Sequence, residues 1–277
     1  MIGSFIALLS AASWGAGDFL GGLATRKQNQ FQVLWITTCS SLTLMALLAV
    51  LWGEHLPSVS NILIALAAGI SGSLGLSALY KGLSMGNAAL VSSVAGVVGA
   101  IIPTLVGVWI EGMPSTLHLI GYGLSIAGIW LVTLSKGENR MQVKQGLSLA
   151  LLAGIGFGGF LAIIAQIEGE QIFAPLVIAK LASLTVALIL LRTRKLPIPK
   201  LSALPTAIWS GFLDAGGNFL YLLATQFTRL DIAAVLSSLY PAGTVLLSTI
   251  LLKEKLSQAQ WLGVGVCLLA IGMITSG

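Results

Sequence analysis

Long apolar runs separated by short polar breaks dominate the pattern of this chain. The runs cover residues 2–24, 31–52, 61–83, 88–110, 117–135, 145–166, 172–191, 204–226, 230–252 and 259–275. Each is close to the roughly 20 apolar residues that an α-helix needs to cross a bilayer, and about twice the length of a membrane-barrel strand. The pattern therefore predicts an all-α integral membrane protein with ten transmembrane helices joined by short loops.

The composition narrows the class of protein further. Of 277 residues, 56% are hydrophobic and 8% charged, and the mean hydropathy is +0.98. Soluble domains carry about 25% charged residues, and disordered chains combine low hydrophobicity with high net charge, so both classes are excluded. Cys39 and Cys267 belong to no CxxC motif, and we expect neither a metal site nor a cofactor.

Basic residues gather in every second loop. The loops after the first, third, fifth, seventh and ninth runs, together with the end of the third run, hold Arg26, Lys27, Lys81, Lys136, Arg140, Lys144, Arg192, Arg194, Lys195, Lys200, Lys253 and Lys255. The positive-inside rule places these loops in the cytoplasm and both termini outside. Loop charge of this kind faces anionic lipid, so the net charge of +5 requires no nucleic-acid partner.

The two halves of the sequence resemble each other. AALVSS at 88–93 matches AAVLSS at 233–238, and GYG at 121–123 matches GVG at 263–265. Because each half has five runs, an odd number, the second half must insert upside down relative to the first. We therefore expect two inverted five-helix repeats, residues 1–137 and 143–277, with a substrate site near the midplane between them.

Several motifs carry a resemblance to a known family. They are the Trp-Gly pair at 14–15, an acidic residue before the fifth run of each half (Glu111 and Glu254), and YPAGTVLLSTILLKEKLSQAQWLGVGVCLLAIG at 240–272. Together with the ten runs they resemble the drug/metabolite transporter superfamily, in particular its EamA-type ten-helix transporters. The first half departs from that pattern, with Gly96 where the family usually has proline. The resemblance implies a carrier for small metabolites such as amino acids, sugars or organic cations, and favours export over import.

Three charged residues lie deep within the apolar runs, away from the run ends: Asp18, Lys180 and Asp214. An ionised side chain at the bilayer centre costs about 2.5–3.5 kcal/mol on insertion scales, so each needs a partner or a water-filled cavity. One interpretation is an ion pair between Lys180 and Asp214 that fixes helix packing. The other is contact with the transported molecule, with Lys180 facing a carboxylate and the two aspartates facing an amine or a coupling proton.

Uncharged polar and aromatic residues complete the candidate site. Asn218 and Tyr221 share the helical face of Asp214, and Trp14 lies one turn before Asp18. The predicted substrate-binding residues are Trp14, Asp18, Tyr80, Gln166, Lys180, Asp214, Asn218, Tyr221 and Tyr240. For the uncharged members, ordinary packing is the alternative role. Pro241, inside the ninth run, is a candidate hinge.

The sequence thus predicts a secondary-active transporter of the inner cell membrane. It would export small polar or amphipathic metabolites such as amino acids by alternating access, driven by a proton or substrate gradient, as a monomer or homodimer. No GxxxxGK[ST] motif occurs, so ATP is not expected as the energy source. A passive channel is the alternative. An intramembrane aspartyl protease is a further one, because GAGDF at 15–19 contains GxGD, although the PAL motif of those enzymes is missing.

Overall fold

The structure is a computed structural model that describes residues 2–111, 115–133, 140–164, 166–168, 171–200, 204–227, 236–237 and 239–275. Within these ranges the chain forms ten helices and no strand, which confirms the all-α prediction. The helices are α1 (Ile2–Thr25), α2 (Gln30–Leu51), α3 (Val59–Ser84), α4 (Ala88–Glu111), α5 (Thr116–Thr133), α6 (Arg140–Ile164), α7 (Phe173–Thr193), α8 (Pro205–Phe227), α10 (Tyr240–Leu251) and α11 (Gln258–Thr275).

Polar residues at the breaks between runs begin several of the helices. The Asn29 side chain accepts a hydrogen bond from the Phe31 amide at 3.0 Å, and Ser58 caps α3 by accepting from the Asn61 amide at 3.3 Å. Such side chains satisfy amide groups that have no partner within the helix. Helix α6 begins five residues before its apolar run, because its polar first turns contain good helix formers such as Lys144. Of the ninth run, residues 228–235 lie outside the described part.

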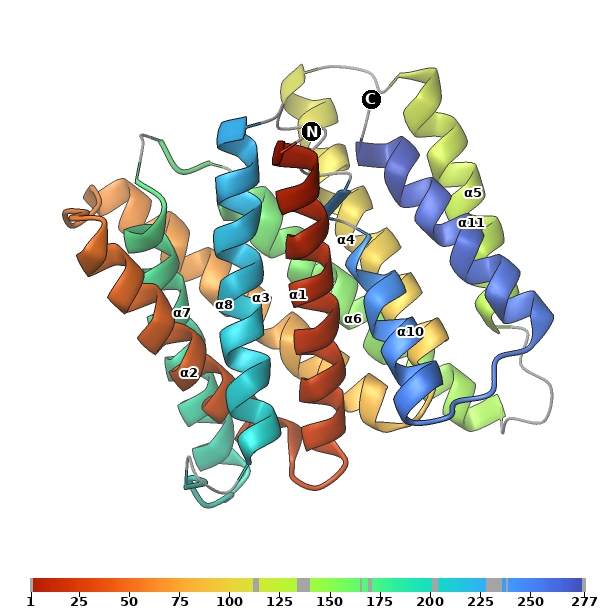
Figure 1. Cartoon of the computed structure of the whole chain (residues 1–277), viewed down its shortest axis with the longest axis horizontal. Coiled ribbons are helices and arrows are strands. Elements are labelled where there is room, and N and C mark those ends of the chain that lie inside the picture. The colour runs from red at the N-terminus through yellow and green to blue at the C-terminus, as the bar shows by residue number, and fades with distance from the viewer. Residues whose placement is uncertain are drawn as a thin grey trace.

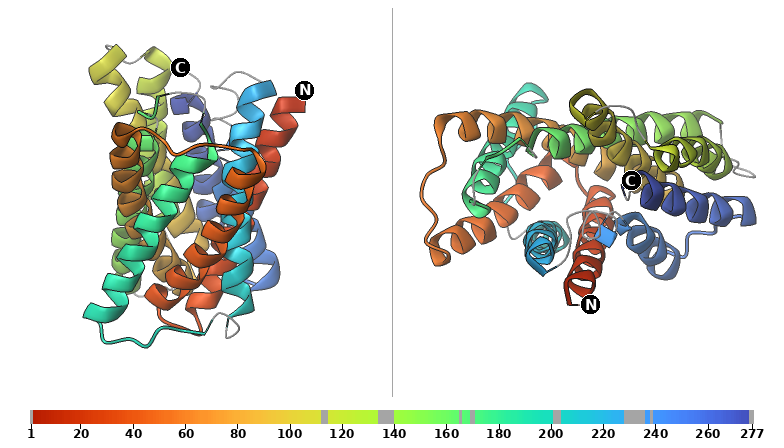
Figure 2. Two further views of the ribbon diagram at one scale, coloured as in Figure 1. Left: turned by 90° about the vertical axis from the view of Figure 1, so that its left-hand side faces the viewer. Right: turned by 90° about the horizontal axis from the view of Figure 1, so that it is seen from above.

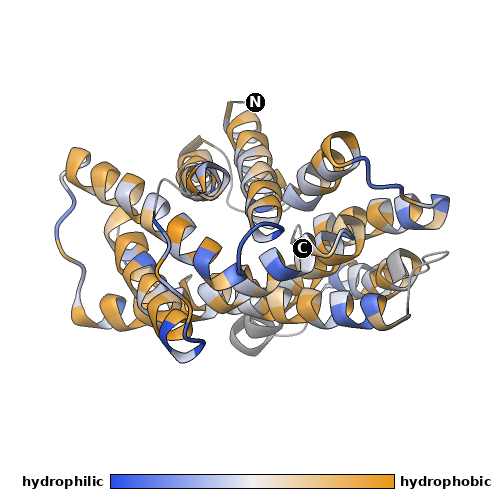
Figure 3. Cartoon of the chain, turned by 90° about the horizontal axis from the view of Figure 1, so that it is seen from below, coloured by the Kyte–Doolittle hydropathy of each residue, from blue (hydrophilic) through white to orange (hydrophobic). Residues whose placement is uncertain are grey.

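The length and composition of the helices fit a membrane environment. Helices α1, α2, α3, α6 and α7 are long and apolar enough to cross a bilayer, and α4, α5, α10 and α11 contain shorter apolar stretches. The helices lie side by side along a common direction, and both termini are at the same end of the bundle (Figures 1 and 2). Hydrophilic residues are concentrated in the loops and at the helix ends, as the view from below shows (Figure 3).

Helices of the two halves pack on each other in a reciprocal way. Helix α1 packs on α8 and α10, the third and fourth helices described in the second half, whereas α6 packs on α3 and α4 of the first half. Glycines allow the close approach in both places. A side chain at Gly15 would collide with the α10 backbone at Gly243, and one at Gly158 would collide with α4 at Gly99 and Ile102. This reciprocity supports the interpretation of two related halves, which stays a prediction.

Candidate functional site

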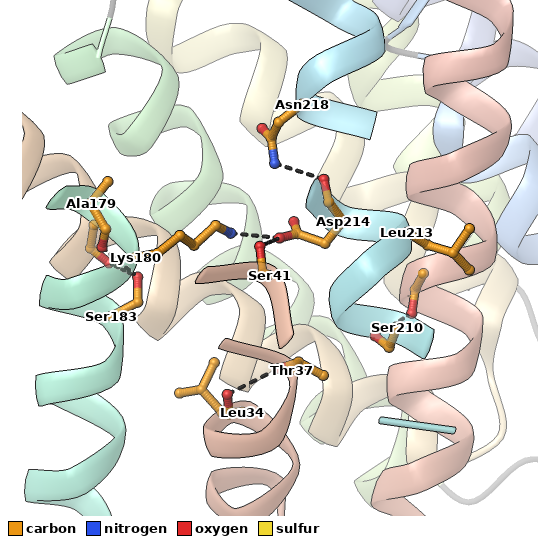
Figure 4. Close-up of polar contacts among 12 residues, drawn as sticks. Leu34, Thr37, Ser41, Ala179, Lys180, Ser183, Ser210, Leu213, Asp214 and Asn218 are labelled. Atoms are coloured by element: carbon orange, nitrogen blue, oxygen red, sulfur yellow. Dashed lines mark hydrogen bonds and ion pairs between the residues drawn. The ribbon is translucent and has the colours of Figure 1, made fainter. Parts of the chain in front are cut away.

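An ion pair joins α7 to α8 inside the bundle. The Lys180 ammonium lies 2.5 Å from Asp214 Oδ2, and the Ser41 hydroxyl of α2 donates to the same oxygen at 2.9 Å (Figure 4). The side chains of Lys180 and Asp214 are 15% and 23% exposed. Asn218, one turn further along α8, donates to the backbone carbonyl of Asp214 at 2.7 Å. The predicted Lys180–Asp214 pair is therefore present, and it occupies the lysine that was the candidate for a substrate carboxylate.

Asp18 lies on the other side of α8, in α1. Its charge is close enough to act on Asp214 and on Tyr240, but no described residue forms a hydrogen bond or an ion pair with its carboxylate. The side chain keeps partial solvent access although it lies deep within the protein. Asp18 is thus a partly exposed carboxylate without a hydrogen-bond or ion-pair partner among the residues that the structure describes.

Hydrogen bonds from three serine hydroxyls set the position of α1 against α8. Ser10 donates to the Gly217 carbonyl at 2.8 Å and Ser13 donates to the Leu213 carbonyl at 2.7 Å, while Ser210 donates to Gly17 at 2.7 Å. These bonds satisfy polar groups in an apolar surrounding, where an unmade hydrogen bond is costly. They fix the helix face that carries Asp18.

Three aromatic side chains gather one turn from Asp18. The Trp14 ring lies 5.9 Å from the Tyr221 ring of α8 and 6.3 Å, nearly edge-on, from the Tyr240 ring of α10, measured between centroids. Gly217 makes room for the indole, since a side chain at that position would collide with Trp14. All three aromatic residues are partly exposed. Together with Asp18 they form what we call the α1 site: Trp14, Asp18, Tyr221 and Tyr240.

Tyr80, another predicted site residue, lies beneath the α1 site and is buried. It is 1% exposed, its ring rests on Gly21 of α1, and its hydroxyl is 2.9 Å from the Ser210 hydroxyl. In this conformation Tyr80 has no surface to offer a substrate. It helps to hold α1, α3 and α8 together.

Two further predictions differ from the arrangement that the structure shows. Gln166 is predicted as the last residue of the sixth run, but α6 ends at Ile164 and Gln166 is exposed. Pro241 was expected inside a helix, yet it lies in the first turn of α10, where it removes no helical hydrogen bond. Its ring packs against Gly96 of α4.

Two carboxylates link the halves at the helix ends. Glu54, after α2, accepts from the amides of Ile172, Phe173 and Ala174 at the start of α7. Glu254, after α10, accepts from the Ala88 amide at the start of α4 and forms an ion pair with Arg26 at 2.8 Å. A carboxylate is favourable at a helix N-terminus because of the exposed amides and the helix dipole.

Sequence reasoning missed several of these residues. Ser41, Ser210 and Gly217 belong to residue types that are abundant in this chain, and no spacing motif distinguishes them. Arg26 was interpreted only as loop charge that sets the topology. A signal existed for Glu254, which is one of the acidic residues that precede the fifth run of each half.

A bundle of apolar helices with charged and aromatic side chains inside is typical of a membrane transport protein. The comparisons with known proteins agree with this class. The sequence profile of the EamA-like transporter family matches residues 1–134 and 144–276, so the chain belongs to the EamA-like transporter family. The prediction from the sequence motifs is thereby confirmed.

Individual proteins show the same relationship. The chain is 28% identical over 200 residues to the uncharacterized inner membrane transporter YedA of Escherichia coli K12, and equally to YedA of the O6:H1 and O157:H7 strains. The alignment covers 67% of this chain and 62% of the relative, less than two thirds of its length. A protein of known crystal structure has the same fold, with a TM-score of 0.63 at 14% identity over 98% of this chain and 95% of that one.

Family membership separates a transporter from the protease among the classes that the sequence left open. The chain belongs to a family of membrane transporters, so the protease alternative is wrong. The contacts of Asp214 also argue against a protease. A proteolytic carboxylate dyad shares a proton between its two members, whereas Asp214 binds Lys180 and Ser41.

Proposed function

We propose that this protein is a secondary-active carrier of the inner membrane that exports small polar or amphipathic metabolites, such as amino acids, by alternating access. Site residues come from both halves of the chain, and this observation carries the proposal. Trp14 and Asp18 belong to the first half, whereas Tyr221 and Tyr240 belong to the second. A rocking motion of one half against the other would pull these two sets apart and expose the site to one side at a time.

The contacts between the halves support such a motion. Around the α1 site they include close glycine contacts and hydrogen bonds from single hydroxyl groups, such as that of Thr244 to the Gly15 carbonyl at 3.1 Å. Each such bond contributes only about 0.5–1.5 kcal/mol, so a few can be exchanged during a transport cycle. The energy would come from a proton gradient or from the gradient of the substrate itself.

Counterflow in proteoliposomes tests the proposal against a passive channel. Vesicles are preloaded with an unlabelled amino acid or amine, and the uptake of the same labelled compound is followed. A carrier should accumulate label transiently above equilibrium and show saturable initial rates, and both should be lost in Asp18→Asn and in Trp14→Ala. Glu168→Gln, which changes an exposed carboxylate outside the helices, is the control.

One result would refute the carrier, and another would refute the location of its substrate site. Uptake that equilibrates without overshoot and does not saturate would identify a channel. Overshoot that is unchanged in Asp18→Asn and Trp14→Ala would move the substrate away from the α1 site. A protonophore that abolishes uphill transport would identify protons as the coupling ion, and no effect would leave the substrate gradient as the energy source.

A further inference from the structure

We infer that the ion pair between Arg26 and Glu254 is a latch, which closes the transporter at one end and must open in every transport cycle. The inference rests on the proposed carrier function and assigns a moving part to it. It follows from three observations: the helices that the pair joins, the packed layer between the pair and the α1 site, and a glycine contact that can serve as a pivot.

The pair joins two helices that contribute different parts of the α1 site. Arg26 directly follows α1, the helix of Asp18, and Glu254 follows α10, the helix of Tyr240. Helices α1 and α10 both end on the side of the bundle opposite to the termini (Figure 1). Of the two ion pairs among the described residues, the other lies within the second half, so this is the one that links the halves. Separation of the halves at this end must therefore break it.

Both oxygens of the Glu254 carboxylate are engaged at this junction. Oε1 lies 2.8 Å from the Arg26 guanidinium, and Oε2 accepts from the Ala88 amide at the start of α4 at 3.1 Å. Gly86, in the turn between α3 and α4, lies beside the pair with a φ of +85°, which other residues rarely adopt. The side chains of Arg26 and Glu254 are 32% and 11% exposed. The contact is thus specific, and water can still reach it when the pair separates.

A packed layer lies along α1 between the α1 site and the ion pair. The turn of α1 that follows the site packs on α3: a side chain at Gly21 would collide with Tyr80, and one at Gly22 would collide with Leu83. Tyr80 is 1% exposed and Leu83 is 5% exposed, so this layer is closed in the present conformation. The ion pair connects the end of α1 to the turn after α3 and thereby holds these two helices together at the layer.

The glycine contact between α1 and α10 can serve as a pivot. A Cβ at Gly15 would lie 3.1 Å from the Gly243 Cα, so the two backbones meet here without side chains between them. From Gly15, α1 continues to Thr25, a distance of about 15 Å at 1.5 Å per residue. A tilt of roughly 15° at the pivot moves that end by about 4 Å. Such a displacement is enough to separate an ion pair that is 2.8 Å long.

Reversible cross-linking of the latch distinguishes a moving contact from a static one. Arg26→Cys/Glu254→Cys, in a background without Cys39 and Cys267, is reconstituted and treated with a bifunctional methanethiosulfonate, whose disulfide bonds to the protein are cleaved by dithiothreitol. Counterflow requires the site to face each side in turn, so the link should lower it about tenfold or more, and dithiothreitol should restore it. Counterflow that continues in the cross-linked protein would overturn the inference, because a static contact tolerates a link.

Two controls isolate the effect of the link. Each single-cysteine variant is treated with the bifunctional reagent, and the double variant is treated with a monofunctional methanethiosulfonate. Both treatments remove the ion pair without joining the helices, so counterflow should persist. Loss of counterflow in either control would overturn the inference, because the missing pair rather than the link would then be the cause. Absence of counterflow in the unmodified transporter would refute the carrier function instead.

A reporter cysteine in the packed layer gives a readout that does not depend on transport. Leu83→Cys, purified in detergent in the same cysteine-free background, is exposed to an impermeant thiol reagent well below the melting temperature. Arg26→Gln should raise its labelling rate about fivefold, the population shift expected for an ion pair of this exposure. Lys27→Gln is the matched control, since Lys27 is the exposed neighbour and forms no ion pair with a described residue. Equal labelling rates in the two variants would overturn the inference, whether or not they transport.

Discussion

The ion pair between Lys180 and Asp214 makes a quantitative prediction about stability. Breaking a fully buried pair costs about 3–5 kcal/mol, and an exposed pair is worth about 0–1 kcal/mol. The two side chains here are 15% and 23% exposed, which is close to the buried limit. Lys180→Met leaves the Asp214 carboxylate with Ser41 and near the charge of Asp18. We therefore expect a loss of about 2–4 kcal/mol, or roughly 5–15 °C in melting temperature at about 2–4 °C per kcal/mol.

Melting in detergent with a double-mutant cycle is the assay for this prediction. Lys180→Met/Asp214→Leu should recover most of the loss, because replacing both members of a buried pair by apolar residues is often neutral or stabilising. Ser41 can then donate to a backbone carbonyl of its own helix. Lys81→Met is the control, since Lys81 is exposed at the end of α3 and forms no ion pair with any described residue. Losses that simply add in the double variant would refute the pairing.

Three further predictions concern packing, helix ends and topology. Gly217→Ala should lower the melting temperature because its methyl group displaces Trp14, at about 1–3 kcal/mol for overpacking, whereas Gly123→Ala meets no atom within 4 Å and should not lower it. Glu254→Gln should lower the free energy of unfolding by about 1 kcal/mol at low salt. In 1 M salt the Debye length falls to about 3 Å, so the difference in melting between variant and wild type should be smaller there. A cysteine in place of Ile2, in a background without Cys39 and Cys267, should react with an impermeant thiol reagent in intact cells. Labelling only after lysis would place the termini inside.

The helices could be predicted from the sequence because the bilayer imposes a length on every apolar run. The observed starts and ends of α1, α2 and α4 lie within one residue of the predicted runs. The prediction fails where the apolar run and the helix begin or end at different residues. Hydropathy detects the lipid-facing segment, so it missed the polar first turns of α6, and it placed the end of the sixth run at residue 166, past the end of α6 at Ile164.

The candidate site was predictable only where burial is costly. Charge at membrane depth singles out Asp18, Lys180 and Asp214, and it also indicated the correct pair. The free-energy cost of burying a charge gives no such guidance for Tyr80, which is uncharged. Its buried position depends on the space above Gly21 and on the Ser210 hydroxyl. Both are contacts between residues far apart in the sequence, and no local pattern records them. The same holds for the hydrogen bonds from serine hydroxyls between α1 and α8.

The two carboxylates at the helix ends have a consequence for how the chain is assembled. Glu54 is synthesised before the start of α7, so that end can be capped as soon as it is made. Ala88 at the start of α4 precedes Glu254 by 166 residues, and ribosomes add about 5–20 residues per second. The first half therefore waits roughly 8–33 s for a group that it needs at its own helix end. Insertion of the last helical hairpin thus completes α4 as well as the second half.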